Sequence, residues 1–397
     1  MNDSLLHFRS EFPILATTNY MVSNSLGAMP RAVPAMLAEY AEEWATRGVR
    51  AWAQGWWDMP IRVGDEIAPL IGAGEGEVAM VPNVSIAQAQ ILSALDYTPG
   101  GRDTIVMTEM DFPSVRYVYD ELATRLGARI VVVPTDDGVS IDEDRLLAAI
   151  DERTRLVAIS HVLFRSAYVL NARRICEHAH RVGALVSLDA YHSVGIIPVD
   201  VKAMRPDFLT GGVLKWLCGG PGGCFLWARP EVSETIAPAL TGWQAHEHPF
   251  AFEPEMAYAG GAWRWLTGTP SIPALFAAVA GPRLVQQAGL TAIREKSIRQ
   301  TTRLIELADA RGFAVTAPRA ADRRGGTVAF DVPHAREVAQ ALLARDVIVD
   351  YRPGAGIRVA PHFYTSDAEV EAVVAHIDDI LAKDAWMRYT DNKLVVT

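Results

Sequence analysis

Cysteine is scarce in this chain of 397 residues. The three cysteines, Cys176, Cys218 and Cys224, are odd in number and form no CxxC pair. This excludes a disulfide framework and a zinc knuckle, and it favours a protein of the reducing cytoplasm. Long apolar runs are also missing, and the stretch MNDSLLHFRSEFP lacks the apolar centre of a signal peptide. We therefore expect a cytoplasmic protein without a membrane segment.

Positive charge is the second shortage. Lysine and arginine total 37 against 47 aspartates and glutamates, which gives a formal net charge of −10. A protein that follows nucleic-acid phosphates needs a basic face, so nucleic acid is excluded as a partner. Only five of the basic residues are lysines, which makes each of them conspicuous. The apolar share of 50% is that of an ordinary globular protein, and the length predicts two or three folding units.

Short apolar runs alternate with amphipathic stretches between about residues 77 and 228. We interpret these runs as buried strands because they are short, rich in valine or isoleucine and bounded by turn residues. They are EVAMV, DTIVMT, RIVVVP, RLVAIS, ALVSLD, DFLTG and CFLWA. Helices are expected between them, at 113–127, 142–150 and 171–182. Alternating strands and helices predict βαβ units and a mostly parallel sheet flanked by helices.

A second unit is expected in the last third of the chain. A long helical pattern runs from Pro270 to about Arg311, and strands return in GFAVTA, GTVAFDV, VIVDY and GIRVA. Further helices are expected at 31–47, 335–344 and 366–384. We therefore predict an α/β protein with a large domain of residues 46–274. A smaller α/β domain is expected to combine residues 1–45 with 275–397.

Lys215 is the first candidate for chemistry. It lies in GGVLKWLCGGPGGCFLW, directly after the expected strand DFLTG, and Asp207 is the only charged residue within eight positions. Apolar surroundings lower the pKa of a lysine, which is what Schiff-base chemistry requires. A lysine in a loop can instead extend its ammonium group into water, so the neighbouring signals must decide.

Asp189 follows the expected strand ALVSL at its carboxyl end, where open α/β sheets bind their ligands. A carboxylate there holds a protonated ring nitrogen well, and the alternative is a cap on the next segment. His192 leaves the same turn and is either a contact of the same ligand or a core histidine with its partners inside the protein.

One short segment and two single residues also fit a ligand with a ring and acidic groups. Asn83, Val84 and Ser85 precede a helix, whose free N–H groups form either a phosphate cradle or a plain capping turn. Phe112, after the strand TIVMTEMD, either stacks on a planar ring or belongs to the core. Arg358 in GIRVAPHFY either binds a carboxylate or pairs with an acidic neighbour on the sheet.

Competing motifs are weak. The glycines at positions 72, 74 and 76 have no strand-to-helix GxGxxG context, and GxSxG is absent. The pairs His178/His180 and His246/His248 lack an HExxH context and clustered carboxylates. No metal site is therefore expected.

Ten segments spread over nearly the whole chain carry a combined signal. They are NSLGAMP (24–30), GWWDMPIRVGDEIAPLIGA (55–73), NVSIAQAQILSAL (83–95), DFPSV (111–115), SHVLFRSAY (160–168), LDAYHSVGIIPVDV (188–201), DFLTGGVLKWLCGGPGG (207–223), TGWQAH (241–246), WLTGTPSI (265–272) and IVDYRPGAGIRVAPHFYTS (348–366). Their combination resembles the kynureninase branch of the fold-type I, aminotransferase class V-like enzymes, which use pyridoxal 5'-phosphate (PLP).

The resemblance implies a PLP-dependent transferase fold of type I and a set of residues that bind the cofactor. Lys215 would bind PLP covalently, Asp189 would hold its pyridine nitrogen, and Phe112 would stack on its ring. The other implied contacts of PLP lie beside the ring or at the phosphate, and they are Val84, Ser85, His192, Gly268 and Thr269. Thr269 would reach the phosphate from the neighbouring subunit, which implies a homodimer with active sites at the interface.

The resemblance also implies an amino-acid substrate. Arg358 would bind its α-carboxylate, and Asn24, Trp56 and His246 fall where residues of the family contact substrate. Lys215 would be the catalytic residue that removes the α-proton. The implied reaction is the hydrolytic Cβ–Cγ cleavage of a β-acyl alanine such as L-kynurenine.

Three polar positions of the family are apolar in this chain. Leu214 stands where kynureninases have a phosphate-binding tyrosine implicated in proton transfer, Val115 replaces an aspartate, and Leu163 replaces an asparagine. Two alternatives therefore stay open. One is a diverged class V aminotransferase, β-eliminating lyase or decarboxylase, and the other is a non-catalytic PLP-binding module. A cysteine desulfurase is disfavoured, because the loop DYRPGAG carries no cysteine.

Overall fold

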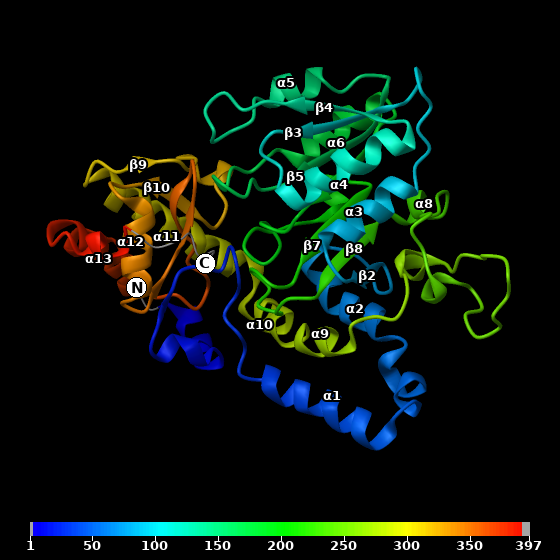
Figure 1. Ribbon diagram of the computed structural model, residues 1–397, viewed down its shortest axis with the longest axis horizontal. Coiled ribbons are helices and arrows are strands. Elements are labelled where there is room, and N and C mark those ends of the chain that lie inside the picture. The colour runs from blue at the N-terminus through cyan, green and yellow to red at the C-terminus, as the bar shows by residue number, and fades with distance from the viewer. Residues whose placement is uncertain (1–2, 391–397) are drawn as a thin grey trace.

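Seven strands form a large sheet in the computed structural model, which describes residues 3–390. Their order is β2-β8-β7-β6-β5-β3-β4, and β8 alone runs against both of its neighbours. The strands are β2 (Val78–Val81), β3 (Thr104–Thr108), β4 (Arg129–Val133), β5 (Thr154–Ser160), β6 (Leu185–Asp189), β7 (Phe208–Gly212) and β8 (Cys224–Ala228). All seven strands expected between residues 77 and 228 are present, in a mostly parallel sheet (Figure 1).

Helices cover both faces of this sheet. The main ones are α2 (Met59–Ile71), α3 (Val84–Ser93), α4 (Pro113–Ala123) and α6 (Ala172–Arg181). Along β3 the side chains alternate, so that Ile105 packs in one core with Ile91 of α3. Val106 packs in the opposite core with Ile175 of α6. Each such burial contributes about 1.5–3 kcal/mol, which makes the sheet a firm frame for the loops at its edge.

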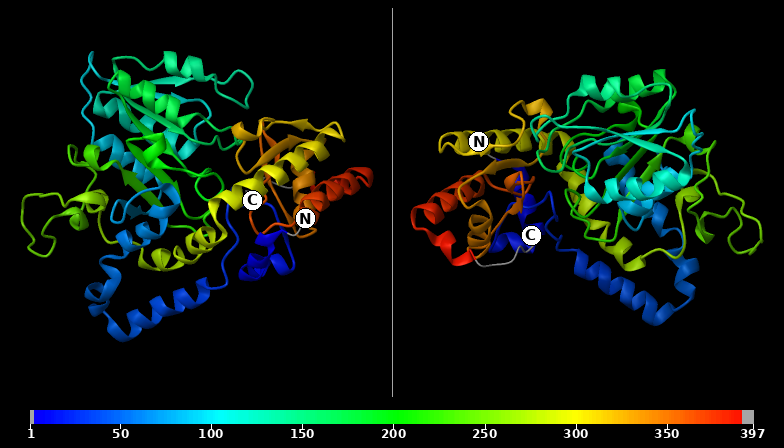
Figure 2. Two further views of the ribbon diagram at one scale, coloured as in Figure 1. Left: turned by 180° about the vertical axis from the view of Figure 1, so that it is seen from behind. Right: turned by 45° about the horizontal axis from the view of Figure 1, so that its top comes forward.

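A smaller α/β unit lies beside the large sheet (Figures 1 and 2). Its four antiparallel strands have the order β12-β13-β10-β9. Its elements are α11 (Leu290–Asp309), β9 (Ala314–Val315), β10 (Val328–Asp331), α12 (Ala335–Leu343), β12 (Asp350–Arg352), β13 (Gly356–Val359) and α13 (Asp367–Ala382). Leu304, Val338 and Val374, from the three helices, share one buried core with the strands. The second α/β unit expected from the sequence is therefore present.

The single strand expected at 347–351 is divided in the structure. β11 (Val347–Ile348) pairs in parallel with β1 (Asn19–Tyr20), whereas β12 pairs with β13. The amino-terminal segment continues along this unit, because the N–H of Ala360 donates to the carbonyl oxygen of Met21 at 2.7 Å. The sequence pattern missed the division because the strand that captures residues 347–348 lies more than three hundred positions away in the chain.

Helix α1 (Val33–Arg47) forms a long arm that packs on α9 (Ile272–Ala277) below the large sheet (Figure 1). The remaining α-helices are short, and they are α5 (Glu143–Ala148), α7 (Val201–Met204), α8 (Pro230–Ser233) and α10 (Ala280–Ala288). The expected domain boundary after residue 45 falls inside α1. The division into one domain of residues 46–274 and a second domain of the other residues stays a proposal. Across residues 3–390 no helix is long and apolar enough to cross a membrane.

Candidate active site

A cavity of about 630 Å³ opens at the carboxyl ends of the parallel strands. Open α/β sheets bind their ligands at this edge, and cavities of this size hold small molecules. Of the twelve residues to which the resemblance gives a role, eight line it, and they are Asn24, Val84, Ser85, Phe112, Asp189, His192, Lys215 and Arg358. They come from segments far apart in the chain, so the fold is what brings them together.

Lys215 stands on a turn directly after β7. Its Nζ lies 2.7 Å from Nε2 of His192 and 5.3 Å from the ring centroid of Phe112. Burial lowers the pKa of Lys215, although the nearby carboxyl of Asp189 opposes this effect. Burial and the neighbouring ammonium group also hold the pKa of His192 well below its usual range, so its ring is neutral. A lysine that loses its proton this readily is suited to attack a carbonyl carbon.

Asp189 ends β6 and is buried in the same cavity. The N–H of Tyr191 donates to its Oδ1 at 2.9 Å. Burial raises the pKa of the Asp189 carboxyl, while this hydrogen bond and the ammonium group of Lys215 act in the opposite direction. A buried carboxyl of this kind gains most from a cationic N–H partner, which a protonated ring nitrogen provides.

The amino terminus of α3 faces the cavity through Asn83, Val84 and Ser85. Asn83 caps the helix, because its Oδ1 accepts from the N–H of Ile86 at 3.1 Å. The sequence left open whether Asn83 forms a capping turn, and the structure shows that it does. The N–H groups of Val84 and Ser85 precede the first helical hydrogen bond, which runs from Ala87 to Asn83. They remain available for an anion, as at other phosphate-binding helix termini.

Arg358 extends from β13 toward the other side of the cavity. Its guanidinium donates to the carboxylate of Asp350 and to the carbonyl oxygen of Phe164. Asp350 lies opposite Arg358 in the register of β12 and β13, and it also pairs with Arg352. Burial lowers the pKa of Arg358 to about 10, which leaves it charged at neutral pH. Arg358 therefore has an acidic neighbour on the sheet and also lines the cavity, where its fork of N–H groups suits a carboxylate.

Asn24 presents an unpaired amide to the cavity. It is 1% exposed, and neither its Oδ1 nor its Nδ2 has a hydrogen-bond partner within residues 3–390. Leaving such groups buried and unpaired costs about 1–3 kcal/mol each, so a ligand that pairs with them recovers this energy. The amide thus marks the place of a polar ligand group.

Four predicted residues do not line this cavity within one chain. Trp56 donates from Nε1 to Glu43 Oε2 at 2.7 Å, and His246 Nε2 lies 3.1 Å from the carbonyl oxygen of Glu255. Gly268 and Thr269 lie in an exposed segment before α9. A single chain therefore does not bring these four positions to Lys215.

The three apolar replacements have different surroundings. Leu214 lines the cavity beside Lys215. Val115 and Leu163 are buried in the two cores on either side of the large sheet. Of the three, only Leu214 changes the surface that a ligand in this cavity would touch.

Gly27 fixes the position of the lysine turn and provides a stability test. Its N–H donates to the carbonyl oxygen of Leu214 at 2.7 Å. A Cβ atom at this position would overlap the carbonyl oxygen of Lys215 and lie 2.8 Å from the sulfur of Cys218. We expect Gly27→Ala to lower the free energy of unfolding by about 1–3 kcal/mol, because this packed backbone must move apart. Urea denaturation measures the change.

The matched control for Gly27 is Gly260→Ala. Gly260 has a backbone that any residue adopts, with φ −79°, and nothing lies within 4 Å of an added Cβ atom. We expect this substitution to change the unfolding free energy by less than about 0.5 kcal/mol. Equal losses in the two variants would contradict the close packing of Gly27 against the lysine turn.

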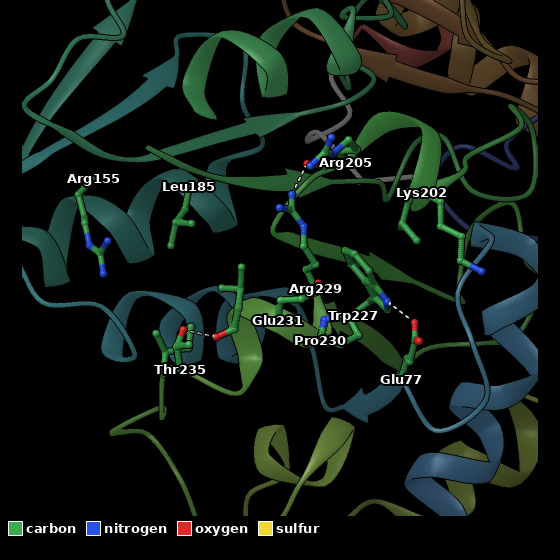
Figure 3. Close-up of a pocket in the computed structure, with 13 residues that line it drawn as sticks. Glu77, Arg155, Leu185, Lys202, Arg205, Trp227, Arg229, Pro230, Glu231 and Thr235 are labelled. Atoms are coloured by element: carbon green, nitrogen blue, oxygen red, sulfur yellow. Dashed lines mark hydrogen bonds between the residues drawn. The ribbon is translucent and has the colours of Figure 1, made fainter. Parts of the chain in front are cut away.

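A second cavity of about 730 Å³ opens near the opposite ends of the strands, where Arg155 and Leu185 lie in the first two residues of β5 and β6 (Figure 3). Arg155 and Lys202 lie on opposite sides of it in the close-up, with Arg229 between them. None of the site residues predicted from the sequence lines it. We therefore assign the chemistry to the cavity that contains Lys215.

Sequence reasoning missed several side chains of the Lys215 cavity, among them Arg352 and Tyr191, and it missed Asp350 behind them. Arg352 and Tyr191 line the cavity, and Asp350 holds both Arg352 and Arg358. The segment DYRPGAGIR contained a usable signal, because its central PGAG predicts a hairpin that sets Asp350 opposite Arg358. Tyr191, two residues after Asp189, had no such signal.

Comparison with known proteins gives the family. The aminotransferase class-V family model matches residues 20–371. A kynureninase of Burkholderia pseudomallei is 33% identical over 398 residues, which cover 97% of this chain and 94% of that protein. A kynureninase of Pseudomonas fluorescens is 33% identical over 396 residues, with the same coverage of both chains.

Solved structures give the fold. A cysteine desulfurase of Thermococcus onnurineus has a TM-score of 0.84 at 24% identity and covers 95% of this chain and 98% of its own. A variant of the cystine C–S lyase C-DES, with glycine linked to its PLP cofactor, has a TM-score of 0.86 at 21% identity, with 94% and 99% covered. At these identities the likeness shows the fold alone. The chain thus belongs to the aminotransferase class V family and is a kynureninase-like, PLP-dependent enzyme of fold type I.

Proposed function

We propose that this enzyme hydrolyses the Cβ–Cγ bond of a β-acyl alanine such as L-kynurenine. The observation that carries the proposal is the 33% identity to kynureninases along nearly the whole chain. The reaction consumes one water molecule. It releases L-alanine and the carboxylic acid of the acyl group, which is anthranilate when the substrate is L-kynurenine.

The cavity fits PLP group by group. The N–H groups of Val84 and Ser85 would hold the phosphate, Asp189 the pyridine nitrogen, and Phe112 one face of the ring. Lys215 would hold the aldehyde carbon covalently. The fit rests on two features of the cavity. The buried carboxyl of Asp189 favours a cationic N–H group, and the open amino terminus of α3 favours an anion. When bound, PLP draws off the electron pair left on the substrate when a bond to Cα breaks.

The chain's own side chains would then position the amino acid. Arg358 would bind the α-carboxylate through its fork of N–H groups, and the amide of Asn24 would pair with a second polar group of the substrate. Lys215, released from the cofactor, would take the proton from Cα. Phe164, Val162 and Leu214 give the cavity an apolar wall, which suits an aromatic acyl group.

Two other activities compete less well. Cysteine desulfurases use a nucleophilic thiol, but all three cysteines here are buried and none lines the cavity. Burial raises the pKa of Cys218 to about 12, so its thiol stays protonated.

The second candidate function is that of an aminotransferase, lyase or decarboxylase on another amino acid. Leu214 is the observation in its favour, because the phenol that kynureninases have at this position is missing. Membership of an enzyme family sets aside the non-catalytic module.

Turnover of L-kynurenine tests the proposal. The purified PLP-loaded enzyme is mixed with L-kynurenine, and anthranilate is followed by its fluorescence and alanine by chromatography. We expect equal amounts of the two products. Pyridoxamine phosphate, carbon dioxide or ammonia formed from another amino acid, with no anthranilate from L-kynurenine, would overturn the proposal in favour of the second candidate.

The active site is proposed to be shared between two copies of the chain. Thr269 and Gly268 are exposed, and they lie away from the cavity of their own chain. Trp243, Phe250 and Phe252 form an aromatic cluster that is 41%, 61% and 75% exposed. Apolar patches of this kind mark contact surfaces, and a homodimer would cover them while bringing Thr269 to the neighbour's phosphate.

Subunit exchange between two inactive variants tests the shared site. In a mixed dimer of Lys215→Ala and Thr269→Ala chains, one site regains both an intact lysine and an intact threonine. We expect the mixture to turn over substrate faster than the sum of the two separate preparations. A monomer of full activity in sedimentation, or no gain after exchange, would contradict the proposal.

The cytoplasm is the proposed location of the enzyme. All three cysteines are unpaired in the structure and buried. Free thiols persist in reducing compartments, whereas secreted proteins tend to pair them. Cell fractionation with an antibody against the protein tests this location, and recovery outside the cytoplasm would contradict it.

A further inference from the structure

Tyr191 is an aromatic side chain of the cavity for which the proposed chemistry has no role. It follows Asp189 by two residues, and its ring centroid lies 5.3 Å from the Nζ of Lys215. The ring of Phe112 lies at the same 5.3 Å from that nitrogen. The lysine nitrogen is therefore close to two aromatic side chains from different segments, one of them a phenol.

The ring of Tyr191 lies directly over Gly212 of β7. A Cβ atom at position 212 would overlap Cε1, Cζ and the hydroxyl oxygen of Tyr191, so only glycine leaves room for the ring there. The hydroxyl interacts with the thiol of Cys224 on β8. The Tyr191 side chain thus begins just after β6, lies over β7 and brings its hydroxyl group close to β8.

This direction leads toward the expected phosphate. Cys224 pairs with Val81 of β2, the next strand, and neighbouring strands lie about 4.8 Å apart. Asn83, in the loop after β2, and Val84 and Ser85, at the start of α3, line the same cavity as Tyr191. The hydroxyl group therefore lies on the side of the cavity where the amino terminus of α3 would hold an anion.

We propose that the Tyr191 hydroxyl binds the phosphate group of PLP and supplies the phenol that position 214 lacks. This assignment rests on the proposed cofactor site. A thiol is a weak hydrogen-bond acceptor, whereas a phosphate oxygen accepts a charge-assisted bond about twice as strong as a neutral one. The hydroxyl, which lies beside the Cys224 thiol, would therefore gain a stronger partner in a phosphate oxygen.

The test compares PLP with pyridoxal, which has the same ring and aldehyde and no phosphate. Each is titrated into cofactor-free wild type and Tyr191→Phe, and binding is followed by the visible absorbance that depends on Lys215. We expect the Kd of PLP to rise about 10-fold or more in the variant, the usual range for a lost hydrogen bond to a charged group. The Kd of pyridoxal is expected to stay within about twofold.

Two further variants locate the ring and the hydroxyl separately. Gly212→Ala displaces the ring and is expected to weaken PLP more than pyridoxal. Leu214→Tyr in the Tyr191→Phe background returns a phenol beside Lys215 and is expected to recover PLP affinity. Thermal melting of each cofactor-free variant checks that the fold is kept. Only variants whose melting temperature matches that of the wild type are compared.

Each outcome decides between readings. A loss confined to PLP supports the assignment. Equal losses for PLP and pyridoxal, or no loss with either, would overturn it and leave Tyr191 as a wall of the ring site. A wild-type protein that gives no Lys215-dependent absorbance with either compound would contradict the proposed cofactor site itself, and the assignment with it.

Discussion

Replacing Lys215 by alanine is expected to abolish both the visible absorbance of the PLP-loaded enzyme and its turnover. The absorbance disappears because, within residues 3–390, the Nζ that faces Phe112 and His192 is the only lysine nitrogen that lines the cavity. Turnover falls by about 10³-fold or more, because proton transfer by a positioned side chain alone contributes about 10²–10⁴-fold. Absorbance spectra and anthranilate release measure the two effects on one preparation.

Lys202→Ala is the matched control. Lys202 is an exposed lysine that lines the other cavity, at the opposite ends of the strands (Figure 3). Its removal is expected to leave the spectrum and the turnover unchanged. If Lys215→Ala kept the absorbance and the activity, the covalent chemistry would belong to another residue.

Replacing Arg358 by lysine is expected to raise the KM for the amino-acid substrate about 10- to 100-fold. Arginine presents a planar fork to a carboxylate, whereas lysine is a single point donor. Asp350, on the neighbouring strand, holds the guanidinium of Arg358 in place, and a lysine at this buried position does not keep that arrangement. The expected range follows from the loss of about 1.5–3 kcal/mol for a hydrogen bond to a charged group. Steady-state kinetics measure it.

The α-carboxylate itself supplies the control for Arg358. The methyl ester of the substrate has no carboxylate charge, so it is expected to bind wild type and Arg358→Lys about equally. A variant that loses affinity for the acid and the ester alike would show that Arg358 holds the sheet together rather than the substrate. PLP content is measured in both proteins, because the proposed phosphate and ring contacts do not include Arg358.

Much of the fold could be predicted from local patterns. The seven strands of the large sheet are short apolar runs bounded by turn residues, and each occurs where that pattern indicated it. Asp189 and Lys215 follow two of these strands, and parallel strands end at one edge of a sheet. The meeting of the two side chains in one cavity was therefore predictable, and the structure brings them together. Their roles toward PLP stay predictions.

The rest depended on contacts between distant segments. The strand Asn19–Tyr20 pairs with residues 347–348, a partner that no local pattern indicates. Tyr191 gains its place only because Gly212, on the next strand, carries no side chain. Trp56, His246, Gly268 and Thr269 do not line the cavity of their own chain, so their predicted roles depend on a second subunit.

Borohydride reduction followed by peptide mapping tests the central claim most directly. Reduction fixes PLP on the lysine that binds it, and the chain offers only five lysines. The peptide that contains Lys215 is predicted to carry the added mass of the reduced cofactor in stoichiometric amount. The same mass on any of the other four lysines, or on no lysine at all, would contradict the assignment of the Lys215 cavity as the active site.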